Sequence, residues 1–153
     1  MLLQKPIPDC YRAAEAERRI ALIATSFVRL LGRPLIDATS DVVAALWGAA
    51  PVIVAYGAEA DPVFFFGNRR ALEVFECDVA HFTRMPSRLS AEAPLREERQ
   101  ALLERVAAQG YIDDYAGVRI TATGKRFPIE RAVVWNLVDE AGRRHGQAAA
   151  FTV

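Results

Sequence analysis

The sequence predicts an α+β domain: a five-stranded antiparallel sheet with central helices on one face, preceded in the chain by N-terminal helices. Two observations lead to this class. Apolar residues recur at helical spacing in the first third and the middle of the chain, whereas short apolar or alternating runs, typical of strands, lie at residues 52–66 and in the last third. Strands that bracket a helical middle favour a single antiparallel sheet with helices packed against it.

The chain is expected to begin with two helices. From Ala13 to Leu31 the apolar residues follow a helical period, charged residues occupy most other positions, and Gly32 ends the pattern. A shorter helix should follow, with Thr39 or Ser40 as its N-cap and Gly48 at its end.

We divide the chain into an N-terminal helical extension, residues 1–50, and a main domain, residues 51–153. The main domain should open with a hairpin, because a β-branched run from Val52 to Tyr56 is separated from the aromatic run Val63 to Phe66 by turn-forming residues. Asn68 follows directly and is suited to cap the first central helix.

The second half should hold one long helix and three strands. An amphipathic helix is predicted from Leu95 to Gln109, after a stretch with one or two short helices that break near Pro86 and Pro94. Alternation in the middle one of the three strands puts five apolar side chains on one face: Phe127, Ile129, Val133, Trp135 and Leu137. This face is too apolar to lie bare, and we expect it to pack against the central helices or to line a small cavity beside them.

Composition and charge exclude several classes of protein. The chain carries 19 basic and 19 acidic side chains, so its formal net charge is zero, whereas nucleic-acid binders usually show a basic excess. No apolar run reaches the ~18 residues that span a bilayer, and the first residues lack the pattern of a secretion signal. We expect a cytoplasmic protein with no nucleic-acid partner and no membrane partner.

Thiols and imidazoles are scarce. Cys10 and Cys77 are the only cysteines and lie far apart, so no disulfide framework is expected. His81 and His145 are the only histidines, and these four scattered residues do not readily form a zinc site. The sequence therefore predicts no metal site, and it leaves any organic cofactor unknown.

Four runs of sequence carry a resemblance to a known family. They are DPVFFFGNRRALEVFE (residues 61–76), PSRLSAE (residues 86–92), REER (residues 96–99) and QGYIDDYAGVRITATGKRFPIERAVVWNLVDEAGRRHGQAA (residues 109–149). Together they resemble bacterial MEKHLA-domain proteins. The resemblance implies the PAS fold, in which two N-terminal and three C-terminal strands flank central helices. It also implies a stand-alone regulatory domain, non-catalytic, that senses a ligand or binds a protein.

A PAS-like fold implies a pocket between the concave face of the sheet and the central helices. Nine polar or amphipathic residues are candidates to line it and to bind a small-molecule ligand: Asn68, His81, Arg88, Tyr111, Tyr115, Arg119, Arg131, Trp135 and Asn136. Trp135 shares a face with apolar residues, so the plainer interpretation is that it belongs to the core. By the same alternation Arg131 falls on the face of the strand that carries Trp135, where an unpaired charge is costly. It should pair with Asp113 or Asp114, reach solvent, or meet an acidic ligand.

No catalytic residue is predicted. Asp113 and Asp114 are neighbours in an expected strand, so they should point to opposite faces and not act together as acid and base. Cys77 lacks the motif around the cysteine of flavin photosensors, and a lone helical histidine such as His81 is more often a surface residue than a haem ligand. The alternative function is a small enzyme of the ketosteroid-isomerase-like type, with a buried Asp/Tyr set in an apolar pocket.

The first helix bears on assembly. Its apolar stripe, which includes Ile20, Ile23 and Phe27, needs cover from either the outer face of its own sheet or the same helix of a second chain. PAS-like domains often dimerise through flanking N-terminal helices, so the resemblance implies a homodimer through these helices. A net charge of zero puts no long-range repulsion in the way.

Overall fold

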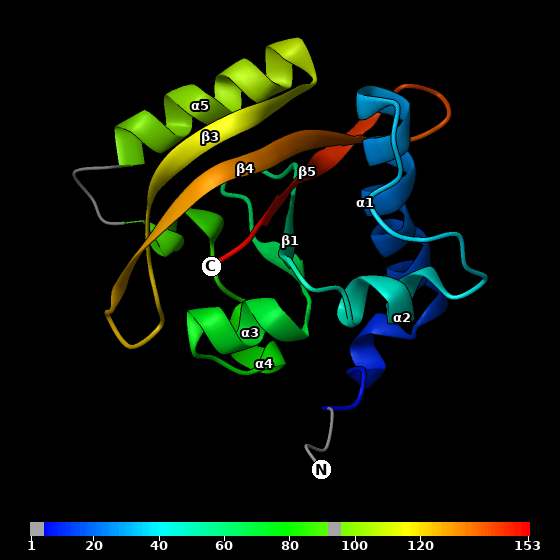
Figure 1. The fold of residues 1–153 in the computed structure, drawn as a ribbon, viewed down its shortest axis with the longest axis horizontal. Coiled ribbons are helices and arrows are strands. Elements are labelled where there is room, and N and C mark those ends of the chain that lie inside the picture. Colours follow the sequence, from blue (N-terminus) through cyan, green and yellow to red (C-terminus); the bar gives the residue numbers. More distant parts are fainter. Residues whose placement is uncertain (1–4, 92–95) are drawn as a thin grey trace.

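Five antiparallel strands form the sheet of this computed structural model, which describes residues 5–91 and 96–153. The strands are β1 (Val52–Gly57), β2 (Phe64–Gly67), β3 (Tyr111–Ile120), β4 (Arg126–Val138) and β5 (Arg144–Phe151). Their order is β2-β1-β5-β4-β3, so the C-terminal strand β5 lies in the centre and joins the two hairpins (Figure 1). The predicted five-stranded antiparallel sheet is confirmed.

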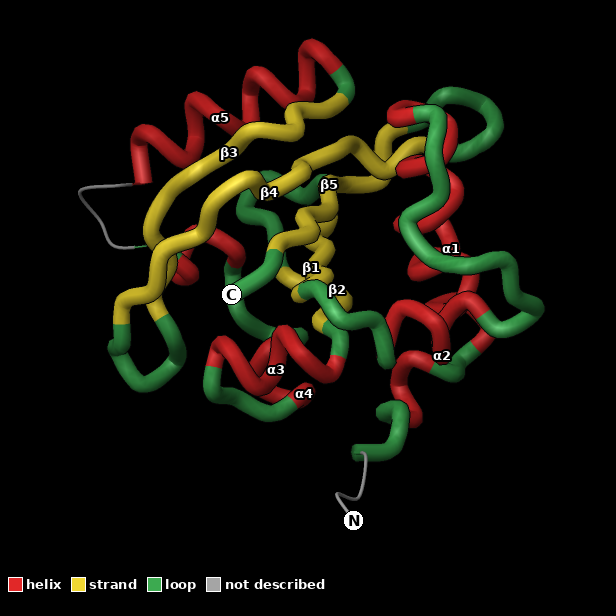
Figure 2. The backbone as a smooth tube through the Cα atoms, viewed as in Figure 1, coloured by secondary structure: helices red, strands yellow, loops and turns green. Residues whose placement is uncertain are grey.

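Helices precede the sheet and connect its two hairpins, as the sequence predicts (Figure 2). They are α1 (Ala14–Leu31), α2 (Val42–Trp47), α3 (Arg69–Phe75), α4 (Val79–Phe82) and α5 (Arg96–Gln109), with short 3-10 helices η1 (Asp9–Tyr11) and η2 (Ser87–Ser90). The predicted helix start at Leu95 and the predicted break at Pro94 lie outside the described residues. In the ranges described, no helix is both long and apolar enough to cross a membrane.

The helices α1 and α5 lie against opposite faces of the sheet. Two consecutive residues of β4 show this, because neighbours in a strand point to opposite sides. Trp135 of β4 packs edge-on against Phe27 of α1, with ring centroids 4.9 Å apart. Its indole N–H donates to the Ile23 carbonyl oxygen at 3.1 Å. The preceding residue, Val134, instead joins Leu102 of α5 in a separate apolar cluster. The sheet is therefore covered on both sides.

A bulge at Arg131 divides the predicted apolar face of β4. Arg131 has a φ of +53°, and between Ile129 and Ala132 the strand holds one residue more than β3 does opposite. The extra residue shifts the alternation, so Ile129, Ala132 and Val134 all face the helices that connect the hairpins, whereas Trp135 faces α1. The prediction therefore holds for Phe127, which packs against Phe75 of α3, and for Ile129. It is wrong for Trp135, because one inserted residue moves every later side chain to the other side.

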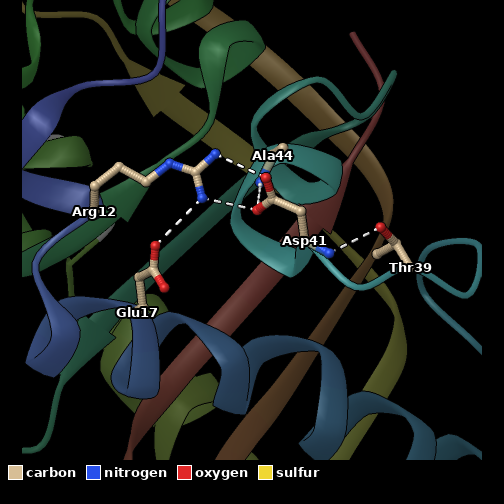
Figure 3. A network of polar contacts seen from close by, with 5 residues as sticks. All are labelled: Arg12, Glu17, Thr39, Asp41 and Ala44. Atoms are coloured by element: carbon tan, nitrogen blue, oxygen red, sulfur yellow. Dashed lines mark hydrogen bonds and ion pairs between the residues drawn. The ribbon is translucent and has the colours of Figure 1, made fainter.

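The N-cap of α2 is Asp41, and the prediction of Thr39 or Ser40 is wrong. The Asp41 carboxylate accepts the backbone N–H of Ala44 at 3.2 Å (Figure 3). The Thr39 hydroxyl accepts the Asp41 N–H at 3.0 Å, which supports the cap from outside the helix. Both residue types suit this role, so local sequence did not distinguish them.

Arg12 ties the N-terminal elements together. Its guanidinium donates to the two Asp41 carboxylate oxygens at 2.8 and 2.9 Å and to Glu17 of α1 at 3.3 Å (Figure 3). The hydrogen bonds from Arg12, with a smaller contribution from the Ala44 N–H, lower the pKa of Asp41 to about 2. The network links the segment before α1 to the start of α2.

The predicted helical extension and the predicted main domain share one hydrophobic core. Ile20 and Phe27 of α1 and Leu46 of α2 are buried in the same apolar cluster as Ile53 and Leu137 of the sheet. Thus α1 covers the outer face of its own sheet, one of the two positions expected for its apolar stripe. The domain boundary after residue 50 stays a prediction.

Candidate ligand-binding site

A small cavity lies between α5 and the face of the sheet that carries Ile129 and Val134. Its volume is about 40 Å³, far below the roughly 300–1,000 Å³ of pockets that hold drug-sized ligands. All five strands, α3, η2 and α5 contribute mostly apolar lining, and its polar side chains are Tyr56, Ser90, Tyr115 and Arg119. In this conformation the cavity has room for a few water molecules at most and is too small for a flavin or a haem.

Tyr115 and Arg119 form the polar wall of the cavity on β3. Arg119 Nη2 donates to the Tyr115 hydroxyl at 2.9 Å, and Nη1 donates to the Val118 carbonyl oxygen at 3.0 Å. No described carboxylate pairs with Arg119. Gly117 makes room for the phenol, since a Cβ there would lie 2.5 Å from the Tyr115 hydroxyl oxygen. The cavity wall thus carries a half-buried guanidinium.

A row of three polar side chains crosses the sheet beside the cavity. Tyr56, Gln147 and Asn136 lie directly opposite one another on β1, β5 and β4. The Tyr56 hydroxyl donates to Gln147 Oε1 at 2.8 Å, and Gln147 Nε2 donates to Asn136 Oδ1 at 3.1 Å. All three side chains are buried, so the hydrogen bonds offset the cost of removing these polar groups from water.

The polar row is bound to the backbone of α5, the helix alongside β3 in Figure 1. Gln147 Nε2 also donates to the Leu103 carbonyl oxygen at 3.1 Å, and Asn136 Nδ2 donates to the Val106 carbonyl oxygen at 3.0 Å. Side-chain amides therefore attach the helix to the centre of the sheet.

A wider cleft lies next to the cavity, and Tyr56 and Leu103 line both spaces. Its volume is about 380 Å³, within the range of small-molecule sites. The loop at residues 59–62, η2, α5 and β5 surround it, and the fully buried Gln147 forms part of its wall. This cleft, unlike the cavity, has room for a small organic ligand.

Three of the nine candidate residues line these two spaces, and a fourth belongs to the polar row beside them. Tyr115 and Arg119 line the cavity, Arg88 lines the cleft, and Asn136 belongs to the polar row. They come from η2, β3 and β4, and the fold brings them together around α5.

The other five candidates lie away from the cavity: Asn68, His81, Tyr111, Arg131 and Trp135. Trp135 is fully buried beneath α1, which confirms that it is a core residue. Asn68 is buried and caps α3. Arg131 takes the second of its expected positions, since its side chain is exposed and forms no ion pair with a described residue. His81 and Tyr111 are exposed.

Gln147 and Tyr56 are not among the residues that the sequence pattern predicted for the site. A signal for Gln147 was present, because it is a lone amide on the apolar side of the last strand, with Ala149 and Phe151. A buried amide needs hydrogen-bond partners, so such a position points to a polar network. Tyr56 gave no such signal, because a tyrosine that ends an apolar strand resembles an ordinary core residue.

None of the described residues that line the cavity is a cysteine. Cys77 does not line it, and burial raises the pKa of the Cys77 thiol to about 11, so the thiol stays protonated at neutral pH. Across residues 5–91 and 96–153, no three histidine, cysteine or acidic side chains come together as a metal site would require.

Solved structures share this fold. The PAS domain of a protein from Colwellia psychrerythraea matches with a TM-score of 0.60 and 14% identity, over 71% of this chain and 89% of that chain. A variant of Vivid matches with a TM-score of 0.59 and 13% identity, over 86% of this chain and 99% of that chain. The sheet order, the helices on its inner face and the space beneath α5 define this chain as a PAS-like module.

The sequence also identifies the family. The family model described as the MEKHLA domain matches residues 17–153. The chain belongs to the MEKHLA domain family, as the four segments quoted above predicted. A homeobox-leucine zipper protein of Arabidopsis thaliana, ATHB-15, is 23% identical over 135 residues, which make up 86% of this chain and 16% of that protein. The chain thus spans only a small part of that relative's length.

Proposed function

We propose that this chain is a sensory module that binds a small molecule beside α5 and reports its presence through a shift of that helix. The observation that carries the proposal is the attachment of α5 to the sheet by Gln147 and Asn136. A ligand that hydrogen-bonds to the Gln147 amide competes with the bond to the Leu103 carbonyl and so favours a different position of α5. Membership of the MEKHLA family and the PAS fold agree with a regulatory role.

A side chain of α5 that lines both spaces supports this coupling. The cavity of about 40 Å³ and the cleft of about 380 Å³ both have Leu103 of α5 in their walls. A ligand in the cleft that extends toward the cavity would have to displace this side chain and the helix that carries it. Binding and movement of α5 would then be one event.

Native mass spectrometry and an absorption spectrum of freshly purified protein would detect a ligand that co-purifies. Hydrogen exchange of ligand-bound and dialysed protein should differ in residues 96–109, because the ligand changes the hydrogen bonds that hold α5. A Gln147→Leu variant should raise exchange in this helix without ligand, whereas Gln109→Leu, at an exposed position of the same helix, should not. A ligand that binds and leaves exchange of α5 unchanged would contradict the proposed relay.

The alternative of a ketosteroid-isomerase-like enzyme gains no support from the cavity. Such an enzyme needs a carboxylate base inside an apolar pocket, and none of the described residues that line the cavity is Asp or Glu. Asp113 and Asp114 are exposed, at a register shift between β3 and β4. We therefore propose no second function.

We also propose that the module acts in the cytoplasm and that its ligand is a small molecule and not a nucleic acid. The formal net charge of zero provides no basic excess for a phosphate backbone. Cys10 and Cys77 are free thiols, which agrees with a reducing compartment. Cell fractionation with an antibody against the intact protein tests the location.

A homodimer through the N-terminal helices is a further part of the proposal. Because α1 already buries Phe27 against its own sheet, the interface would use the outward side of α1, where Val28 is 47% exposed. The same patch on two chains can pair around a two-fold axis.

A further inference from the structure

The cleft beside α5 contains buried polar groups that a ligand could bind. Gln147 in its wall is fully buried. Ser87, also in the wall, is 1% exposed, and its Oγ is buried with no hydrogen-bond partner among the described residues. A buried hydroxyl without a partner is uncommon and costly, and this one belongs to a residue that lines the cleft.

The charged side chains of the cleft indicate what kind of ligand fits. Among the described residues, three of the charged groups in its lining are engaged: Arg88 Nε donates to Asp61 at 3.0 Å, and Glu59 accepts a backbone N–H of its own loop. Glu104 of α5 and Arg144 of β5 remain. Both are exposed, and neither forms an ion pair with a described residue. Arg144 makes one long hydrogen bond, to the uncharged Asn136 side chain at 3.4 Å, and Glu104 makes none among the described residues, so the cleft offers one available anion and one weakly held cation.

We propose that this cleft binds a small zwitterion, a free α-amino acid, with its carboxylate at Arg144 and its ammonium group at Glu104. The inference rests on the proposed function and names its ligand class. A ligand with both charges matches both side chains, whereas a simple anion would meet the repulsion of Glu104 as well as the attraction of Arg144. Pro62 and Ala107 offer apolar surface in the same cleft for the side chain of the amino acid.

The position of the two charged residues connects this ligand to α5. Arg144 Nε donates a long hydrogen bond, 3.4 Å, to Asn136 Oδ1, and Asn136 Nδ2 donates to the Val106 carbonyl oxygen of α5. A ligand carboxylate that draws the guanidinium into the cleft would weaken the bond to Asn136. Glu104 lies on α5 itself, so a zwitterion between Glu104 and Arg144 would bridge the helix and the sheet.

Calorimetric titration of the dialysed full chain with each standard amino acid tests the proposal. At least one should bind, and its two single-charge analogues, one without the amino group and one without the carboxyl group, should each bind at least about tenfold more weakly. Arg144→Gln and Glu104→Gln should each weaken binding by a similar factor. The matched controls are Arg143→Gln, next to Arg144 in the chain, and Glu97→Gln, on the same helix as Glu104. Both residues are exposed and do not line the cleft, so affinity should be unchanged.

Three outcomes would overturn the inference. One is that no amino acid binds at millimolar concentration. Another is that an amino acid binds with the same affinity to the Arg144→Gln and Glu104→Gln variants. The third is that the analogue without an amino group binds as well as the amino acid. In each case a different co-purified ligand that changes hydrogen exchange of α5 would leave the proposed sensory function standing, whereas unchanged exchange with any ligand would contradict that function separately.

Discussion

Asn68 organises the junction between the first hairpin and the central helices with a single side chain. Its Oδ1 accepts the backbone N–H groups of Ala71 and Ile53 at 3.0 and 3.1 Å. Its Nδ2 donates to the carbonyl oxygens of Leu46 and Pro51 at 3.1 and 2.9 Å. The amide thereby caps α3 and fixes the end of α2 and the start of β1 at once.

Replacing Asn68 with Ala should lower the free energy of unfolding by on the order of 3 kcal/mol, because buried backbone groups lose their partners together with the helix cap. Urea denaturation followed by circular dichroism measures the change. Arg84→Ala, at an exposed position between α4 and η2, serves as a control with a small expected effect. A loss well under 1 kcal/mol for Asn68→Ala would show that these bonds contribute little.

Asp41 should titrate well below an ordinary aspartate. Its folded pKa is lowered from 3.8 to about 2, first by the Arg12 hydrogen bonds and then by the Ala44 N–H. Because the folded pKa lies below the unfolded value, the stabilisation is present above about pH 4 and is lost as the pH falls toward 2. Carboxyl chemical shifts followed by NMR should give this pKa, and in Arg12→Gln it should rise toward 3.8. An Asp41 pKa that Arg12→Gln does not change would contradict the role of the ion pair.

At the scale of one element, the bulge in β4 depends on a backbone conformation that most residues avoid. Arg131 has a φ of +53°, in the left-handed region that costs a non-glycine residue about 1–2 kcal/mol. The side chain is exposed, so a substitution there tests the backbone with little effect on packing.

Arg131→Gly should keep or raise stability by up to about 1 kcal/mol, because glycine adopts positive φ without steric cost. Arg131→Val should lower it by about 1–2 kcal/mol, since a β-branched side chain tolerates this region poorly. Both variants are compared by urea denaturation. A valine variant as stable as the glycine variant would show that the bulge relaxes without strain.

At the scale of the whole molecule, α1 determines whether the sheet is protected on its outer face. Removing residues 1–33 should expose Trp135, which packs against Phe27 of α1. The truncated chain should then aggregate or show Trp135 emission shifted toward that of a solvated indole, with Trp47 replaced by Phe to isolate the signal. A truncated chain that stays folded, with Trp135 emission unchanged, would show that residues 34–153 fold without α1.

Light scattering of the full chain at micromolar concentration tests the proposed homodimer and should report twice the chain mass of 16.9 kDa. Replacing exposed Val28 with Glu should give the monomer, because a charge in the apolar part of the interface is costly. Val153→Glu, at an exposed position far from α1 in the sequence, is the matched control. A full chain that is monomeric at every concentration would falsify the dimer.

Local sequence determined much of the architecture. The helical spacing of Ile20, Ile23 and Phe27 predicted α1, and Gly32 ends that helix with a φ of +74° as expected. Asn68 was correctly placed as the cap of α3. These features depend on side chains close together in the chain, whose period and backbone preferences can be read directly.

Only the tertiary structure decided which face of β4 meets which helix and which polar groups meet at its centre. The bulge at Arg131 has no distinctive residue, yet it turns Trp135 away from the central helices and toward α1. Tyr56 and Gln147, which are 91 positions apart, become partners only when β1 and β5 pair. The physical reason is that register and long-range hydrogen bonds depend on the packing of the complete sheet, whereas the pattern of each segment specifies only its own helix or strand.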